Sequence, residues 1–202
     1  MDVAKALEQR RMQRSFDGSE IDADLVASLL ETSLLSPTAG HSRGVRWVYG
    51  IGPKEVAAWF ETATDEPWRA TAPRAKGLAR ASAFCVAICD PQVYVARYAE
   101  EDKSSSGLGQ GAGNWPVPYW HGDAGAASLA LLLLLEEQGL AGCFLGAFRN
   151  EESLRSLMGL SSSELIYGTV LLGRPDGNDH RSRSLDRSGL TREERATRIS
   201  LS

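Results

Sequence analysis

The feature that most constrains this chain is the run YWHGDAGAASLALLLLLEEQGLAG at residues 119–142. Small residues come first and leucines follow, so a helix formed here is apolar around most of its circumference and has to be covered on more than one side. Its longest apolar stretch, residues 124–135, is far short of the ~20 residues needed to span a bilayer. The run therefore predicts a buried central helix, ended by Gly139 or Gly142.

Other segments carry helical or β-type patterns on both sides of this run. The chain has 202 residues, 43% of them hydrophobic, which is enough for a full-sized core, and we read one domain over residues 1–202. Helical periodicity or capping marks residues 3–13, 23–35, 53–62, 68–81 and 151–158. β-type runs fill residues 45–51, 83–89, 143–148 and 165–173.

The charge and the cysteines argue against several classes of protein. A net charge of -4 and a pI of about 5.5 disfavour a general nucleic-acid or membrane-surface binder, which usually carries a positive balance of charge.

The chain has three cysteines, Cys85, Cys89 and Cys143. Their number is odd, they lie in apolar runs, and no two of them form a CxxC pair, which is typical of core thiols in a reduced, cytoplasmic protein. No His neighbours Cys85 and Cys89, so no metal site is expected. The amphipathic start lacks the apolar region of a secretory signal.

Two segments are polar or of low complexity. KSSSGLGQGAGN at residues 103–114 is rich in Gly and Ser. Its GLGQGAG is similar to a dinucleotide fingerprint, but no strand precedes it and no regular helix follows directly, so we predict a flexible loop or lid over residues 103–118. Residues 175–202 form a polar C-terminal extension that would be solvated if it had no partner.

Three arginines stand near the start, in LEQRRMQRSF at residues 7–16. On a helix, Arg10 and Arg14 are four positions apart and Arg11 and Arg14 three, so their side chains can converge on the last turn. Convergent guanidinium groups suit a phosphate, because their planar forks bond its oxygens two at a time. A solvated basic turn that compensates the dipole at a helix end is the alternative, and the residues alone leave both interpretations open.

Four motifs extend this observation over nearly the whole chain. RRMQRSF, LLSPTAGHSRGVRWV, DAGAASLALLLLLEEQGLAGCFLG and GTVLLGRPD follow one another in an order and spacing that resemble the flavin-dependent nitroreductase family. The resemblance implies an α+β fold, a three-layer α/β/α sandwich with a central mixed sheet. It also implies a homodimer that binds FMN at the dimer interface and takes small-molecule substrates. From the charge and the short apolar run we expect no nucleic-acid or membrane partner.

The same resemblance implies a set of cofactor-binding residues. Those of the basic start, which would grip the phosphate and ribityl chain, are Arg10, Arg11, Met12 and Arg14, with Met12 where the family usually has a small hydroxyl residue. Those of the loop that approaches the flavin from the other subunit are Pro37, Thr38, Ala39, Gly40, His41 and Arg43. Leu145 and Gly146 would form the turn that runs along the flavin ring. Late in the chain, Arg181 and Arg183 would return to the phosphate.

The loop departs from the family pattern Pro-Ser-x-x-Asn-x-Gln-Pro. His41 stands where Asn is usual, Arg43 where Gln is usual, and Gly44 where Pro is usual. His41 can still donate to a flavin edge, and Arg43 can bind ribityl oxygens or an anionic substrate. A purely structural role is the alternative for each.

In such a protein FMN carries the redox chemistry, while the chain supplies position, electrostatics and access. The resemblance implies a diffusible NAD(P)H donor and an electron-poor acceptor such as a nitroaromatic or quinone, with ping-pong kinetics and no catalytic side-chain nucleophile. There are two alternative functions. The protein could bind flavin for storage or sensing without turnover, or it could be a reductase that uses another donor, such as a deazaflavin. A nucleic-acid or acidic-partner module built on the arginines is opposed by the total charge. The sequence does not name the physiological acceptor and does not choose between NADH and NADPH as the donor.

The loop NWPVPYWHGD supplies a candidate pocket wall. Trp115, Tyr119 and Trp120 offer flat surfaces, and His121 offers a proton donor. Core or dimer contacts are the alternative for the aromatic residues. His121 and Asp123 are a further candidate pair.

Overall fold

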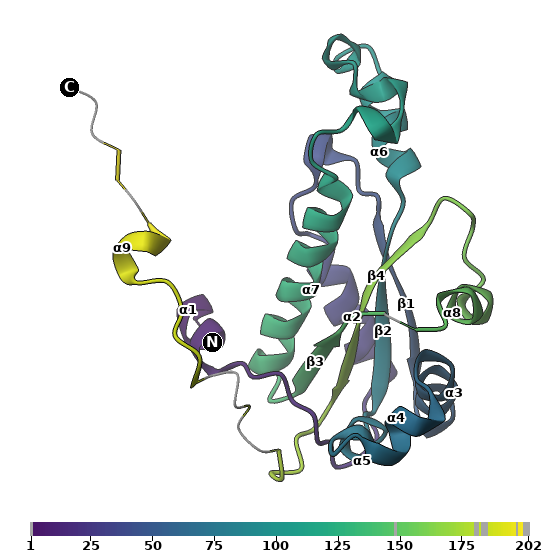
Figure 1. Ribbon diagram of the computed structural model, residues 1–202, viewed down its shortest axis with the longest axis vertical. Coiled ribbons are helices and arrows are strands. Elements are labelled where there is room, and N and C mark those ends of the chain that lie inside the picture. The colour runs from purple at the N-terminus through teal and green to yellow at the C-terminus, as the bar shows by residue number, and fades with distance from the viewer. Residues whose placement is uncertain (1, 148, 180–181, 183–185, 197, 200–202) are drawn as a thin grey trace.

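One sheet forms the centre of the computed structural model, which describes residues 2–147, 149–179, 182, 186–196 and 198–199 (Figure 1). Its strands are β1 (Val45–Ile51), β2 (Ala83–Cys89), β3 (Ala141–Leu145) and β4 (Leu165–Gly173). They lie in the order β1-β2-β4-β3, and each neighbouring pair is antiparallel. The α+β class is therefore confirmed, whereas the expectation of a mixed sheet is wrong for the described strands.

The antiparallel pairing follows from how the connections return. The end of β1 pairs with the start of β2, where Ile51 lies opposite Ala83. The chain likewise leaves β3 and enters β4 at the same end of the sheet. Each of these helical connections returns to the end that it left, so no crossover to a parallel neighbour is made. One parallel bridge, between Met12 and Gly142, lies outside the named strands.

Helices cover both faces of the sheet and make three layers. α2 (Ala23–Ser33) and α7 (Tyr119–Glu137) lie on one face, and α3 (Pro53–Ala63), α4 (Glu66–Thr71), α5 (Ala75–Leu78) and α8 (Glu151–Met158) on the other (Figure 1). β2 is buried along its whole length. Its side chains alternate between the layers, with Phe84 and Val86 packed with Trp59 of α3, and Cys85 with Leu131 of α7.

α7 is the predicted central helix, and its buried residues recur at helical spacing against the sheet and α2. The glycine that terminates it is Gly139, just beyond the C-cap Gln138, and not Gly142. Gly139 is left-handed, with φ 67°. Its N–H donates to Glu136 O at 3.1 Å, and the N–H of Leu140 donates to Leu135 O at 2.9 Å, which together make a Schellman motif. Within the described ranges, no helix is long and apolar enough to cross a membrane.

Two helices differ from their predicted bounds. α1 (Val3–Gln9) ends before the arginines, because the chain becomes extended at Arg10 and residues 12 and 13 bond to Gly142 at the edge of the sheet. The helix expected over residues 68–81 is divided into α4 and α5 around Pro73, whose ring and missing N–H oppose a continuous helix.

A lobe stands at one end of the sheet (Figure 1). It consists of α6 (Pro91–Ala99) and the 3-10 turns η2 (Ser104–Ser106), η3 (Leu108–Gln110) and η4 (Ala112–Asn114). Trp115 is its buried centre, because its indole N–H donates to Leu108 O at 3.0 Å and its ring meets Tyr94 and Tyr98 edge-on. Motion of residues 103–118 as a lid stays a prediction. A last short helix, α9 (Arg192–Arg195), lies in the C-terminal extension.

Candidate functional site

One groove along α7 combines aromatic, apolar and cationic side chains. It has a volume of about 250 Å³. The small and apolar residues of the groove come from α7. Its two aromatic rings come from β3 and β4, and its cationic side chain comes from the segment after α1. The residues that line this feature, which we call the α7 groove, are Arg10, Met12, Gly125, Ser128, Leu129, Leu132, Phe144 and Tyr167.

The wall of the α7 groove is a packed pair of rings. The centroids of Phe144 and Tyr167 are 5.6 Å apart, and the N–H of Phe144 donates to Met12 Sδ at 3.4 Å. A Cβ at Gly125 would lie 2.8 Å from the Tyr167 hydroxyl oxygen, so the glycine permits this ring to approach α7 closely. These contacts build an apolar surface next to the Arg10 side chain.

His121 extends the row of rings. Its ring centroid is 6.1 Å from that of Tyr167, and its Nδ1 is 3.9 Å from Cys89 Sγ. Burial lowers the pKa of His121, so the imidazole is neutral at pH 7. Burial raises the pKa of Cys89 to about 12, so the thiol is protonated. In the described part of the chain His121 has no hydrogen bond to Asp123, and that candidate pair is not formed.

The three arginines occupy different places, because α1 ends at Gln9. Arg10 lines the α7 groove. Arg11 Nη1 donates to three carbonyls at the end of α1. Arg14 Nη1 donates to Met12 O at 2.9 Å. The helical turn expected to join them is absent, and Arg11 instead compensates the dipole at the end of α1.

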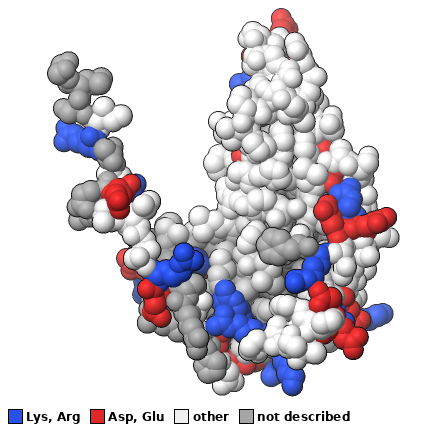
Figure 2. Space-filling model, in the orientation of Figure 1, with Lys and Arg blue, Asp and Glu red and all other residues white. Residues whose placement is uncertain are grey.

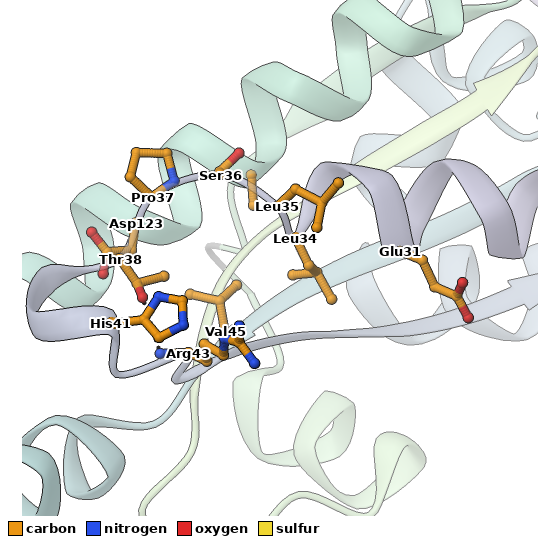
Figure 3. Close-up of a pocket in the computed structure, with 11 residues that line it drawn as sticks. Glu31, Leu34, Leu35, Ser36, Pro37, Thr38, His41, Arg43, Val45 and Asp123 are labelled. Carbon is orange, nitrogen blue, oxygen red and sulfur yellow. Dashed lines mark hydrogen bonds between the residues drawn. The ribbon is translucent and has the colours of Figure 1, made fainter.

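The loop of residues 37–43 forms one wall of a second cavity, of about 460 Å³, between α2 and α7 (Figure 3). The loop residues that line it are Pro37, Thr38, His41 and Arg43. Gly40, His41 and Arg43 are left-handed, with φ of 61°, 58° and 55°. This conformation is uncommon for residues other than glycine. The side chains of His41 and Arg43 are exposed.

The second cavity and the α7 groove lie on different sides of α7. Asp123 lines the cavity, whereas Gly125 lines the groove. A step of two residues turns a helix by roughly 200°. One chain therefore does not bring its own loop of residues 37–43 onto its own α7 groove, and a site that uses both needs a second chain.

The remaining candidate cofactor residues lie beyond β3. Leu145 ends β3 opposite Thr169, and Gly146 follows it directly. Both are half-buried. Arg181 and Arg183 lie outside the described residues.

The aromatic residues of the segment NWPVPYWHGD are mainly core, and the structure places Tyr119 and Trp120 in the first turn of α7. Trp115 and Trp120 are buried and pack with Tyr94. Tyr119 is 49% exposed. The core interpretation thus holds for the two tryptophans.

Sequence reasoning missed two residues of the α7 groove, and a third, Tyr94, whose hydroxyl donates to Asp123 of the second cavity at 2.8 Å. Phe144 and Tyr167 belong to β-type runs in which aromatic residues are ordinary core. Tyr94 lies in α6, to which no role was assigned. For the two tyrosines the available signal was the hydroxyl, since a hydroxyl in an apolar segment needs a polar partner or water. Phe144 gave no such signal.

Comparison with known proteins identifies the family. The model of the Nitroreductase family matches residues 7–174, so the chain belongs to the nitroreductase family and is placed among oxidoreductases. The resemblance seen in the motifs is confirmed. A protein of Archaeoglobus fulgidus named "Putative NADH dehydrogenase/NAD(P)H nitroreductase" is 22% identical over 174 residues, which cover 85% of this chain and 84% of that protein.

Solved structures share the fold. Nitroreductase CinD from Lactococcus lactis, in complex with nicotinic acid, has a TM-score of 0.69 at 20% identity, with 95% of this chain and 100% of that chain covered. A nitroreductase family protein from Clostridium novyi NT has a TM-score of 0.66 at 15% identity, with 88% and 87% covered. At these identities the likeness establishes the fold alone.

Proposed function

We propose that the protein is an FMN-dependent oxidoreductase that passes electrons from NADH or NADPH to an electron-poor acceptor such as a nitroaromatic or a quinone. The observation that carries the proposal is the α7 groove, where an aromatic wall and the cation Arg10 occur together in a chain of the nitroreductase family. An apolar cleft with few polar groups is the usual form of a cofactor site.

The groups of the α7 groove fit FMN, which joins a flat, largely apolar ring to an anionic phosphate. Phe144 and Tyr167 offer the flat surface, Gly125 leaves room beside α7, and Arg10 carries the opposite charge. The residues that we assign to the phosphate, ribityl chain and ring are Arg10, Arg11, Met12, Arg14, Leu145, Gly146, Arg181 and Arg183.

The chemistry that FMN supplies when bound is electron transfer between the nicotinamide donor and the acceptor. The chain itself would bind the flavin, orient it, and keep competing nucleophiles away from it. Burial raises the pKa of Cys143 to about 11 and that of Cys89 to about 12, so neither thiolate competes as a nucleophile at pH 7. Donor and acceptor would use one face in turn, which gives ping-pong kinetics.

A second copy of the chain would complete this site. Leu129 of α7 lines the groove and is 42% exposed. The loop of residues 37–43 lies on the other side of α7 from its own groove. We therefore propose a homodimer in which this loop approaches the FMN of the partner protomer. The loop residues assigned to that contact are Pro37, Thr38, Ala39, Gly40, His41 and Arg43.

Steady-state oxidation of NADH and NADPH by the FMN-loaded protein tests the proposal, with a nitroaromatic or a quinone as acceptor. Parallel lines in double-reciprocal plots at several acceptor concentrations are expected. Bound FMN without oxidation of either nicotinamide would favour storage or sensing, or another donor such as a deazaflavin. Activity that is the same with and without FMN would contradict the proposal.

A further inference from the structure

The carboxylate of Asp123 joins three elements at one oxygen. Its Oδ2 accepts hydrogen bonds from the Tyr94 hydroxyl at 2.8 Å and from the Ala39 N–H at 2.9 Å. Asp123 belongs to α7, Tyr94 to α6, and Ala39 to the loop of residues 37–43. Burial, and then the bond to Asp123, raises the pKa of Tyr94 well above its ordinary value, so the hydroxyl stays a donor. We call these three groups the loop clamp.

One face of α6 holds the rest of the loop. Arg97 Nε donates to Gly40 O at 3.0 Å, and its two terminal nitrogens each donate to Asp102 at 2.7 Å. The ring of Tyr98 lies 2.5 Å from the position that a Cβ of Gly40 would take. Tyr94, Arg97 and Tyr98 are three and four residues apart, so they share one side of the helix.

The loop needs this support because its backbone is in a disfavoured conformation. His41 and Arg43 are left-handed although neither is glycine. Such conformations persist only where the surrounding structure over-determines them. α6 supplies several contacts to the loop. From α7, Asp123 accepts a hydrogen bond from the backbone N–H of Ala39, at the start of the turn.

We propose that Asp123 is a positioning residue, which with Tyr94 holds the loop of residues 37–43 in the conformation that it presents to the flavin site. Asp123 itself would touch neither flavin nor substrate. What the loop contacts rests on the proposed function, whereas the existence of the loop clamp does not. The role differs from that of a catalytic pair with His121, because the bonded oxygen of Asp123 faces Tyr94 and Ala39.

Three substitutions separate the loop clamp from a general loss of stability. Asp123→Leu removes the acceptor at similar size. Asp123→Asn keeps an amide oxygen that can take the place of Oδ2 and accept both bonds, because both donors meet a single oxygen. Tyr98→Phe is the control, since Tyr98 lies on the same face of α6 and its hydroxyl bonds to no residue that the structure describes.

Amide hydrogen exchange of residues 38–44 in the FMN-free protein is the first measurement. We expect exchange about tenfold faster in Asp123→Leu, within about threefold of wild type in Asp123→Asn, and unchanged in Tyr98→Phe. If Asp123→Leu does not fold, Tyr94→Phe removes one donor, keeps the ring, and carries the same expectation. Unchanged exchange of these amides would overturn the proposal.

FMN affinity and kinetics are the second measurement. Asp123→Leu should raise the FMN Kd and the acceptor KM about tenfold with little change in kcat, and Asp123→Asn should restore both. Faster exchange with an unchanged Kd and KM would also overturn the proposal. A wild-type protein that binds no FMN would instead contradict the proposed function, and the exchange experiment would still decide whether the clamp exists.

Discussion

Arg10 and Arg11 are adjacent in sequence but meet different surroundings. Arg10 lines the α7 groove, whereas Arg11 turns back to the last carbonyls of α1. A guanidinium group that already bonds to carbonyls has fewer N–H donors left for a phosphate. The two side chains are therefore expected to contribute unequally to binding an anion.

We predict that Arg10→Ala raises the Kd for FMN about 10- to 100-fold, because a hydrogen bond to a charged group contributes about 1.5–3 kcal/mol. Arg11→Ala is the matched control, and it should raise the Kd less. A titration followed by flavin fluorescence measures both. An equal or larger loss in Arg11→Ala would contradict the assignment of Arg10 to the groove.

Gly44 is a residue at which no side chain fits. A Cβ there would overlap the ring of Tyr94, which is fully buried. We predict that Gly44→Ala lowers the free energy of unfolding by about 1–3 kcal/mol, the usual cost of overpacking, in urea denaturation. Gly113→Ala is the control, because its Cβ would meet no atom within 4 Å. Equal stability of the two variants would mean that the Tyr94 ring can shift without cost.

At the scale of elements, an ion pair ties β1 to the residue before β4. Arg46 of β1 bonds to Glu164, whose other oxygen accepts from the N–H of Ser161 at 2.9 Å. The bond from Arg46 lowers the pKa of Glu164 to about 2. Since this pair spans β2, it links parts of the sheet that share no backbone ladder.

This lowered pKa makes stability depend on pH. Ionised Glu164 stabilises the fold above its ordinary pKa of 4.5, and the contribution is lost as the pH falls from 4.5 to about 2. We predict that Glu164→Gln lowers the free energy of unfolding at pH 7 by about 1 kcal/mol, a small value because Arg46 is half-exposed. The difference should narrow at pH 3 in urea denaturation. A difference that does not depend on pH would rule out this role.

The elements that could be predicted have a local signal. β2 and α7 are long, uniform apolar runs, and their placement needed no knowledge of partners. The sheet type could not be predicted, because it depends on the end at which each connection returns. α1 ends early because pairing at Gly142 prevails over the weak propensity of a short helix.

The candidate site divides in the same way. Motif order pointed to Arg10 and to the loop of residues 37–43. Tyr94, Asp123 and Ala39 come together only because α6, α7 and the loop pack against one another. Sequence spacing holds no information on those distances.

At the scale of the whole molecule, charge is spread unevenly. Figure 2 shows charged side chains gathered over the lower part of the view and along the chain ends, whereas the surface over α7 that faces the viewer is largely uncharged. α7 also exposes Leu129. An uncharged face with exposed leucine suits pairing with a second copy.

We predict a mass in solution about twice the 21.8 kDa of one chain, measured by light scattering. Leu129→Glu should give a monomer that loses FMN, because a carboxylate would be buried without a partner. Leu157→Glu is the control, because Leu157 is similarly exposed at 47% but lies on α8, across the sheet. A monomeric wild-type protein that binds FMN would contradict a site built from two chains.

The central claim is that this chain uses bound FMN to take electrons from a nicotinamide. The most direct measurement is the absorption spectrum of the purified protein before and after FMN is added, followed by anaerobic NADPH or NADH. We predict a flavin spectrum that bleaches with one of the nicotinamides and returns when a nitroaromatic or a quinone is added. A protein that takes up no flavin, or a bound flavin that stays oxidised with both nicotinamides, would contradict the claim.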